Sequence, residues 1–195
     1  MLIIHQNQNA DFKIRTKENI ELADITLAFS LNGKENEIKS VKRLCGILNK
    51  PSIQIDINAL KLAYKNIDSS LFDEIVESIV NVTSANKLKI NIAGSNTSEI
   101  TNFGISVEEF DSIMFFFMSS LYAKLAEKNI GIEMLRGGGQ LGVQTSGIKA
   151  GLKLNKIHNA KIVNSVRCPK DFMYKNEKNN IVKTTFDKIY ALHIP

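Results

Sequence analysis

The sequence predicts an α/β fold in which a Rossmann-like parallel sheet is covered by helices on both faces. Short apolar runs that suit buried strands alternate along the chain with longer stretches of helical spacing. This alternation is typical of a parallel sheet whose crossover connections are helices. The 195 residues suffice for one full-sized core. We therefore expect a single domain over residues 1–195.

Apolar periodicity and turn residues place the individual elements. Strands are expected at 25–29, 52–57, 89–93, 131–135 and 160–164. Helices are expected at 15–22, with Thr16 as N-cap, and at 35–48, 60–64, 71–82, 106–128 and 140–154. Ser106 and Glu109 predict a capping box for the longest helix, whose Phe, Met and Leu stripe should be core. Residues 1–10 match neither pattern, and 172–175 with 181–185 predict a C-terminal β-hairpin.

Composition argues against several classes of function. The net charge is +5, but the lysines are dispersed, the arginines number four and no basic run occurs, so we expect no nucleic-acid partner. No apolar stretch approaches the roughly 20 residues of a membrane span, and no signal-peptide pattern is present. Isolated histidines and two distant cysteines predict neither a metal nor another cofactor. A cytoplasmic protein is expected, in the host cytoplasm if the source is viral.

The strongest functional signal is the glycine-rich segment 135–147, which follows an expected strand and opens an expected helix. Consecutive glycines let the backbone approach an anion closely, and the N–H groups at a helix start favour phosphate. The candidate ligand-binding residues are Arg136, Gly137, Gly138, Gly139, Gln140, Gly142, Gln144 and Thr145. The alternative is a tight turn that needs glycine for its geometry alone. The pattern is neither a Walker P-loop nor the dinucleotide fingerprint.

Two shorter segments are weaker candidates for binding the same ligand. They are Gly94, Ser95 and Asn96 after an expected strand, and Arg15, Thr16 and Asn19 near an expected helix start. An arginine at such a place can hold a phosphate through two parallel hydrogen bonds. A plain turn and a capped surface helix are the alternatives. Because ligands of parallel sheets bind beyond the carboxyl ends of strands, we expect these segments to lie at one edge.

The same segments resemble the SLOG superfamily of Rossmann-like proteins, and most closely its molybdenum-carrier type. Residues 138–147 are similar to the family turn G-G-Q-T-G-[VI]-D-x-A-[GA]. Residues 15–19, followed by 24–27, are similar to the R-T-x-x-N element and the D-x-T-L strand after it. Residues 90–95 resemble the family's first strand and turn. The likeness covers most of the chain, but only these three motifs are specific.

The order of the motifs differs from that of the family. In the family the first strand and the glycine-rich turn precede R-T-x-x-N, whereas here that element is N-terminal. The resemblance therefore implies a circular permutation, with residues 58–86 as the connection between the permuted halves. Such rejoining is tolerated where domain termini lie close together. It also implies that Arg15 and the glycine-rich turn meet at one pocket.

The resemblance implies a nucleotide-derived ligand, ADP-ribose-like or NAD-derived. Gln144 replaces the acidic residue of the family turn, and the P-G-G-x-G-T-x-x-E motif of the related phosphoribohydrolases is absent. Because glycosidic hydrolysis generally uses a carboxylate, we expect a non-catalytic binder that sequesters a signal, for example to block host or bacterial defence. The alternatives are a nucleotide phosphoribohydrolase and a structural or interaction protein with a lost pocket. Apolar faces on the helix expected at 106–128 favour a homodimer or higher homo-oligomer.

Overall fold

Six parallel strands form the central sheet in the order β1-β6-β5-β4-β2-β3. The computed structural model describes residues 1–7, 11–33, 35–169, 172–175 and 181–184. The strands are β1 (Leu2–Asn7), β2 (Ile25–Ser30), β3 (Ser52–Asp56), β4 (Lys87–Gly94), β5 (Gly131–Gly137) and β6 (Val163–Pro169). β7 (Phe172–Lys175) and β8 (Ile181–Thr184) pair antiparallel. The predicted α/β fold and its C-terminal hairpin are confirmed.

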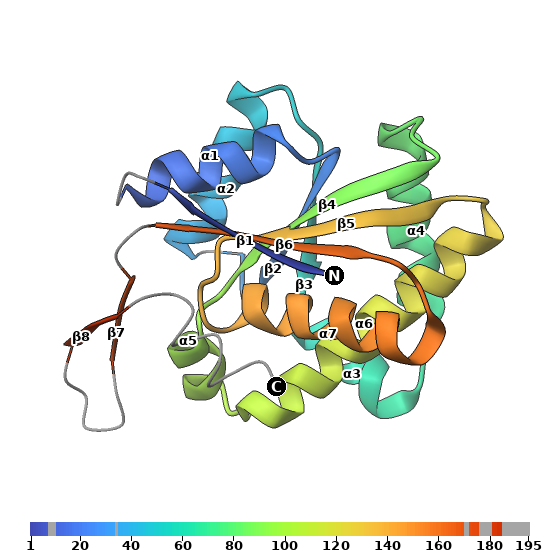
Figure 1. Cartoon of the computed structure of the whole chain (residues 1–195). Coiled ribbons are helices and arrows are strands. Elements are labelled where there is room, and N and C mark those ends of the chain that lie inside the picture. Colours follow the sequence, from blue (N-terminus) through green and yellow to red (C-terminus); the bar gives the residue numbers. More distant parts are fainter. Residues whose placement is uncertain (8–10, 34, 170–171, 176–180, 185–195) are drawn as a thin grey trace.

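Helices cover both faces of the sheet (Figure 1). α1 (Phe12–Glu21) and α2 (Asn36–Ile47) lie on one face. The opposite face carries α3 (Ile57–Asn66), α4 (Ser70–Val82), α6 (Val107–Glu127) and α7 (Val143–His158), with the short α5 (Thr97–Asn102) beside α6. α1 and α2 connect β1, β2 and β3, and these connections run across the sheet toward β3. The connections from β3 to β6 run in the opposite direction along the other face, as right-handed crossovers require.

The apolar stripe of α6 is part of the main core. Seven of its side chains are buried, among them Phe110, Met114 and Phe117, and Phe117 packs edge-on against Phe29 of β2 with ring centroids 5.0 Å apart. The core prediction for this stripe is confirmed. The same packing removes the apolar face that favoured a homodimer, so homo-oligomer formation stays a prediction without that support. Within the described residues, no helix is long and apolar enough to span a bilayer.

The predicted starts of the last helix and of the last sheet strand were each wrong by three residues. α7 begins at Val143, not at residue 140, because Gly142 just before it has φ of 114° and is not helical. β6 begins at Val163, not at residue 160. Asn159 and Lys161 adopt left-handed φ values of 49° and 57°, which a strand excludes. The Asn155 side chain then brackets Ile162, bonding its N–H and its carbonyl at 2.7 Å each.

Two elements and two caps differ from the sequence-based expectation. The start of the chain, where a short apolar run at 2–4 is followed by polar residues, forms β1, which pairs in parallel with β6 at the edge of the sheet. Asp11 rather than Thr16 is the N-cap of α1, accepting from the N–H of Lys13 at 2.8 Å. α5 was not predicted, and the complete capping box is at its start, between Asn96 and Glu99. At α6 the Ser106 hydroxyl accepts from the N–H of Glu109 at 3.1 Å.

Candidate functional site

The helices that follow β2 and β4 lie on opposite faces of the sheet. From β2 the chain reaches β3 through α2, and from β4 it reaches β5 through α5 and α6 on the other face. β2 and β4 are direct neighbours, so their carboxyl ends lie side by side. Ligands of open α/β sheets bind at such a reversal of strand order, because the diverging helices leave a crevice there. This position is the candidate site.

A small cavity lies beside these strand ends, beneath α1 and α2. Its volume is about 10 Å³. That is roughly the space of one water molecule. The lining includes Arg15, Thr16 and Asn19 of α1, Glu37 of α2, and Gly138 and Gln144 of the glycine-rich turn. Two of the three motifs predicted from the sequence thus meet at this cavity. A hydrogen bond joins them between residues that are 123 positions apart in the chain.

That hydrogen bond joins Arg15 to Gly138. Nη1 of Arg15 donates to the carbonyl oxygen of Gly138 at 3.0 Å, and Arg15 is only 4% exposed. Burial lowers the pKa of its guanidinium, and the negative charge of Glu37 partly opposes that shift. Gly138 is needed for the approach, since a Cβ there would lie 2.6 Å from Nε of Arg15. The meeting of Arg15 and the turn is as the resemblance implied, while the circular permutation itself stays a prediction.

The amide of Gln144 occupies the inside of the glycine-rich turn. Its Oε1 accepts from the N–H groups of Gly138, at 2.6 Å, and of Gln140, at 3.3 Å. Its Nε2 donates to Oε1 of Gln140 at 3.2 Å, and Thr145 Oγ1 donates to the Gln140 carbonyl at 2.8 Å. A carbonyl oxygen of the protein therefore sits where an anion would accept from two converging N–H groups.

The third motif is tied directly to the glycine-rich turn. The Ser95 carbonyl accepts from the N–H of Val143 at 3.1 Å, and Asn96 and Gly142 form an isolated antiparallel bridge. A Cβ on Gly142 would lie 2.6 Å from the Ser95 carbonyl oxygen. Asn96 caps α5, while the buried Ser95 hydroxyl has no hydrogen-bond partner among the described residues. Gly94, Ser95 and Asn96 thus support the turn rather than line the cavity.

The remaining predicted residues surround the cavity without lining it. Arg136 and Gly137 end β5, and Arg136 lies in register with Asn91 of β4, on the α1 side of the sheet. Gly139 has φ of 77°, which explains a glycine there by backbone conformation alone. Turn geometry and close packing, without any ligand, therefore account for the glycines at 138, 139 and 142.

Glu37 is a site residue that sequence reasoning missed. It is half-buried on the first turn of α2 and accepts from Nε2 of Gln140 at 3.2 Å. Burial raises the pKa of this carboxyl, the negative charge of Glu99 adds to the rise, and Gln140 and Arg15 oppose it. The only feature of the sequence that points to Glu37 is an acidic residue in the helix that follows an expected strand. That pattern equally marks an ordinary first-turn helix charge, so it does not single Glu37 out.

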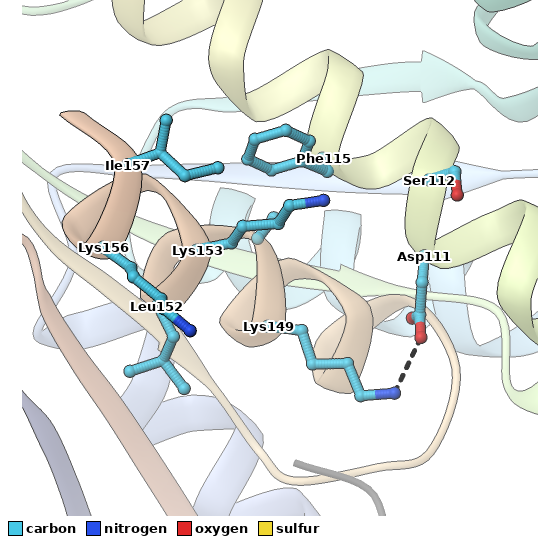
Figure 2. A pocket seen from close by; sticks show the side chains of 9 residues that line it. Asp111, Ser112, Phe115, Lys149, Leu152, Lys153, Lys156 and Ile157 are labelled. Carbon is cyan, nitrogen blue, oxygen red and sulfur yellow. Dashed lines mark hydrogen bonds and ion pairs between the residues drawn. The ribbon is translucent and has the colours of Figure 1, made fainter. Parts of the chain in front are cut away.

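A larger hollow lies elsewhere on the described residues, between α6 and α7 (Figure 2). It is an open groove of about 840 Å³. Lys149, Lys153 and Lys156 of α7 line it, and Lys153 Nζ lies 4.0 Å from the centre of the Phe115 ring. Lys149 pairs with Asp111 at 2.7 Å. This groove lies on the face opposite α1, away from the carboxyl-end crevice, and none of the predicted residues lines it.

Metal ligation has no support in the described part of the chain. No group of three or more His, Cys, Asp or Glu side chains is placed there to hold an ion, and Cys45 and Cys168 are buried and unbridged. Comparisons of the sequence and the structure with protein-family models, curated proteins and solved structures find no match.

Proposed function

We propose that this protein reversibly binds a small, phosphate-bearing, nucleotide-derived molecule at the carboxyl ends of β2, β4 and β5, and thereby sequesters it. ADP-ribose-like and NAD-derived signals are the class we favour. The observation that carries the proposal is the convergence of buried Arg15 and the glycine-rich turn at the reversal of strand order. A cationic side chain at that position suits a phosphate group.

The bound state requires α1 to move. A cavity of about 10 Å³ does not hold a nucleotide. The buried Ile20 anchors α1 in an apolar cluster with Ala28 and Val41. α1 is also held by the Arg15–Gly138 bond and by the ion pair between Glu18 and Arg167 at 3.1 Å. Both are polar contacts that a phosphate competes for, so the ligand itself supplies groups that replace them. A nucleotide-binding protein of this design opens at α1 and closes over its ligand.

Hydrolysis is the second candidate function, and Glu37 is the observation that favours it. A carboxylate with a raised pKa beside a sugar–phosphate site is the group that glycosidic hydrolysis needs. Gln144 cannot take this role, because a neutral amide is no general base near neutral pH. We favour binding over hydrolysis because the amide of Gln140 and the charge of Arg15 both engage Glu37.

The test is to recover what the protein holds and what it does to it. Mass spectrometry of molecules released by heat from the purified protein identifies a co-purifying nucleotide. The protein is then incubated with ADP-ribose, NAD and related nucleotides, first at equal concentration and then in excess. Chromatography of the released material is expected to return the nucleotide unchanged.

Three outcomes separate the readings. Steady conversion of excess nucleotide to a base or a ribose-phosphate product, lost in Glu37→Gln, would show that the enzyme candidate is right. Intact nucleotide recovered from wild type and from Glu37→Gln supports the binder. Neither retention nor conversion of any nucleotide would refute both and favour a structural or interaction protein with a lost pocket.

A further inference from the structure

Arg136 is a buried arginine whose charge has no counterpart among the described residues. It is 6% exposed, and among the described residues it makes no ion pair. In the described part of the chain, Nη1 donates to the Met134 sulfur at 3.0 Å and Nε has no hydrogen-bond partner. Burial, and secondly the positive charge of Arg167, lower the pKa of Arg136. An uncompensated buried cation is costly, so its persistence points to an anion.

The neighbours of Arg136 complete an anion-binding set. Ser165 of β6 is its direct partner in the parallel register, so both side chains lie on the α1 face of the sheet. The Ser165 hydroxyl is buried, and no hydrogen-bond partner is present for it among the described residues. Arg167 follows two residues later on the same face. We call Arg136, Ser165 and Arg167 the Arg136 cluster.

The Arg136 cluster reaches solvent along α1. Arg167 Nη1 pairs with Oε2 of Glu18 at 3.1 Å, and their side chains are 23% and 32% exposed. Glu18 is the one carboxylate paired with the cluster in the described part of the chain. It contacts Arg167 and leaves Arg136 uncompensated.

The glycine-rich turn is less available to an anion than this cluster. Gln144 already satisfies the N–H groups of Gly138 and Gln140, and Ser95 satisfies that of Val143 at the start of α7. The cluster instead retains two buried polar atoms, Nε of Arg136 and the hydroxyl of Ser165, without partners. An incoming anion therefore gains more at the cluster, where no protein hydrogen bond with these atoms must first break.

We propose that Arg136, Ser165 and Arg167 bind a phosphate group, and that this cluster, rather than the start of α7, holds the phosphate end of the ligand. The guanidinium groups donate to the phosphate oxygens in a charge-assisted manner, and the Ser165 hydroxyl donates a further hydrogen bond. The claim that the bound phosphate belongs to a nucleotide rests on the proposed function. Binding of the phosphate group alone is an independent claim.

The probe is therefore inorganic phosphate, titrated into the full chain against sodium chloride of equal ionic strength. Thermal unfolding is expected to shift upward with phosphate and not with chloride, because a ligand that binds the folded state stabilises it. Arg136→Met should weaken phosphate binding roughly tenfold or more, since it removes charged hydrogen bonds. Arg43→Met, a change at an exposed arginine of α2, is the matched control and should bind as wild type does.

Two further variants decide the matter if Arg136→Met does not fold. Glu18→Gln removes the carboxylate that competes for Arg167, so phosphate should bind more tightly. Gln144→Ala frees the N–H groups of Gly138 and Gln140, yet phosphate affinity should stay unchanged. Tighter binding in Gln144→Ala, together with unchanged or weaker binding in Glu18→Gln, would place the phosphate at the turn and overturn the proposal.

The proposal also fails if wild type shows no phosphate-specific shift, or if folded Arg136→Met keeps the whole shift. Failure of the proposed function is a separate result. If phosphate binds through Arg136 but no nucleotide binds, the phosphate site is supported and the proposed nucleotide-binding function is refuted. If nucleotide binds and Arg136→Met does not weaken that binding, the proposed function is supported and only the phosphate site at Arg136 is refuted.

Discussion

The side-chain oxygen of Gln144 accepts a hydrogen bond from the backbone N–H of Gly138 at 2.6 Å, inside the turn that the sequence marks as a phosphate site. The same oxygen also accepts from the N–H of Gln140 at 3.3 Å. One neutral amide thus holds the turn in shape from within. The turn is built as a self-supported structure, and its glycines serve that packing as well as any ligand.

Gln144→Ala is expected to destabilise the fold by about 1–3 kcal/mol, the usual cost of leaving buried donors unsatisfied. Chemical denaturation measures this loss. Gln54→Ala is the control, because Gln54 is exposed and its hydrogen bond to Lys42 lies at the surface. Its cost should stay within about 0.5 kcal/mol. Equal losses in the two variants would show that the Gln144 bonds do not hold the turn.

Gly138→Val is expected to abolish nucleotide binding while leaving the far-ultraviolet circular dichroism nearly unchanged. The first atom of the new side chain would lie 2.6 Å from Nε of Arg15, so the arginine must leave its place. Gly46→Val is a matched control, since a Cβ at this exposed position of α2 meets nothing within 4 Å. Undiminished nucleotide affinity in folded Gly138→Val would remove the turn from the site.

Arg15→Ala should weaken nucleotide binding by roughly tenfold to a hundredfold. This corresponds to the loss of a charge-assisted hydrogen bond of about 1.5–3 kcal/mol. Isothermal titration calorimetry with the nucleotide identified by mass spectrometry measures the change. Arg43→Ala, at an exposed position of the neighbouring helix α2, should bind normally. If both variants bind alike, Arg15 has a structural role only.

Glu37→Gln should raise stability at neutral pH and lose that advantage in acid. Burial raises the pKa of Glu37, whereas the unfolded chain releases this proton near pH ~4.3. Between these two pKa values the folded state binds more protons, so wild-type stability falls as pH rises, and the loss is complete above the raised pKa. Glutamine removes this penalty and keeps an acceptor for Gln140.

Urea denaturation of wild type and Glu37→Gln from about pH 4 to about pH 8 tests this sign. The difference between them should grow with pH and then level off. Glu21→Gln, at an exposed position of α1 paired with Lys17, supplies the comparison. A difference between wild type and Glu37→Gln that is constant over the whole pH range would contradict a raised pKa.

Local pattern was sufficient for most of the fold. The apolar runs around Leu27 and Ile90 predicted buried parallel strands, because burial on both faces leaves a continuous apolar signature. The apolar stripe of α6 predicted the core through its helical spacing. β1 escaped prediction because its apolar run at 2–4 is short and polar residues follow it. The start of β6 was wrong because left-handed residues at 159 and 161 carry no apolar signal.

Sequence alone also singled out two segments that the fold brings together at the strand ends, through Arg15 and the glycines that follow β5. Only the tertiary structure decided what these residues do there. It filled the turn with Gln144 and set Glu37 beside it. It also buried Arg136 in register with Ser165, with no counter-charge for Arg136 among the described residues. The reason is physical: residue type and spacing follow from local backbone periodicity, whereas hydrogen-bond satisfaction and charge compensation depend on side chains that the fold brings together from distant positions.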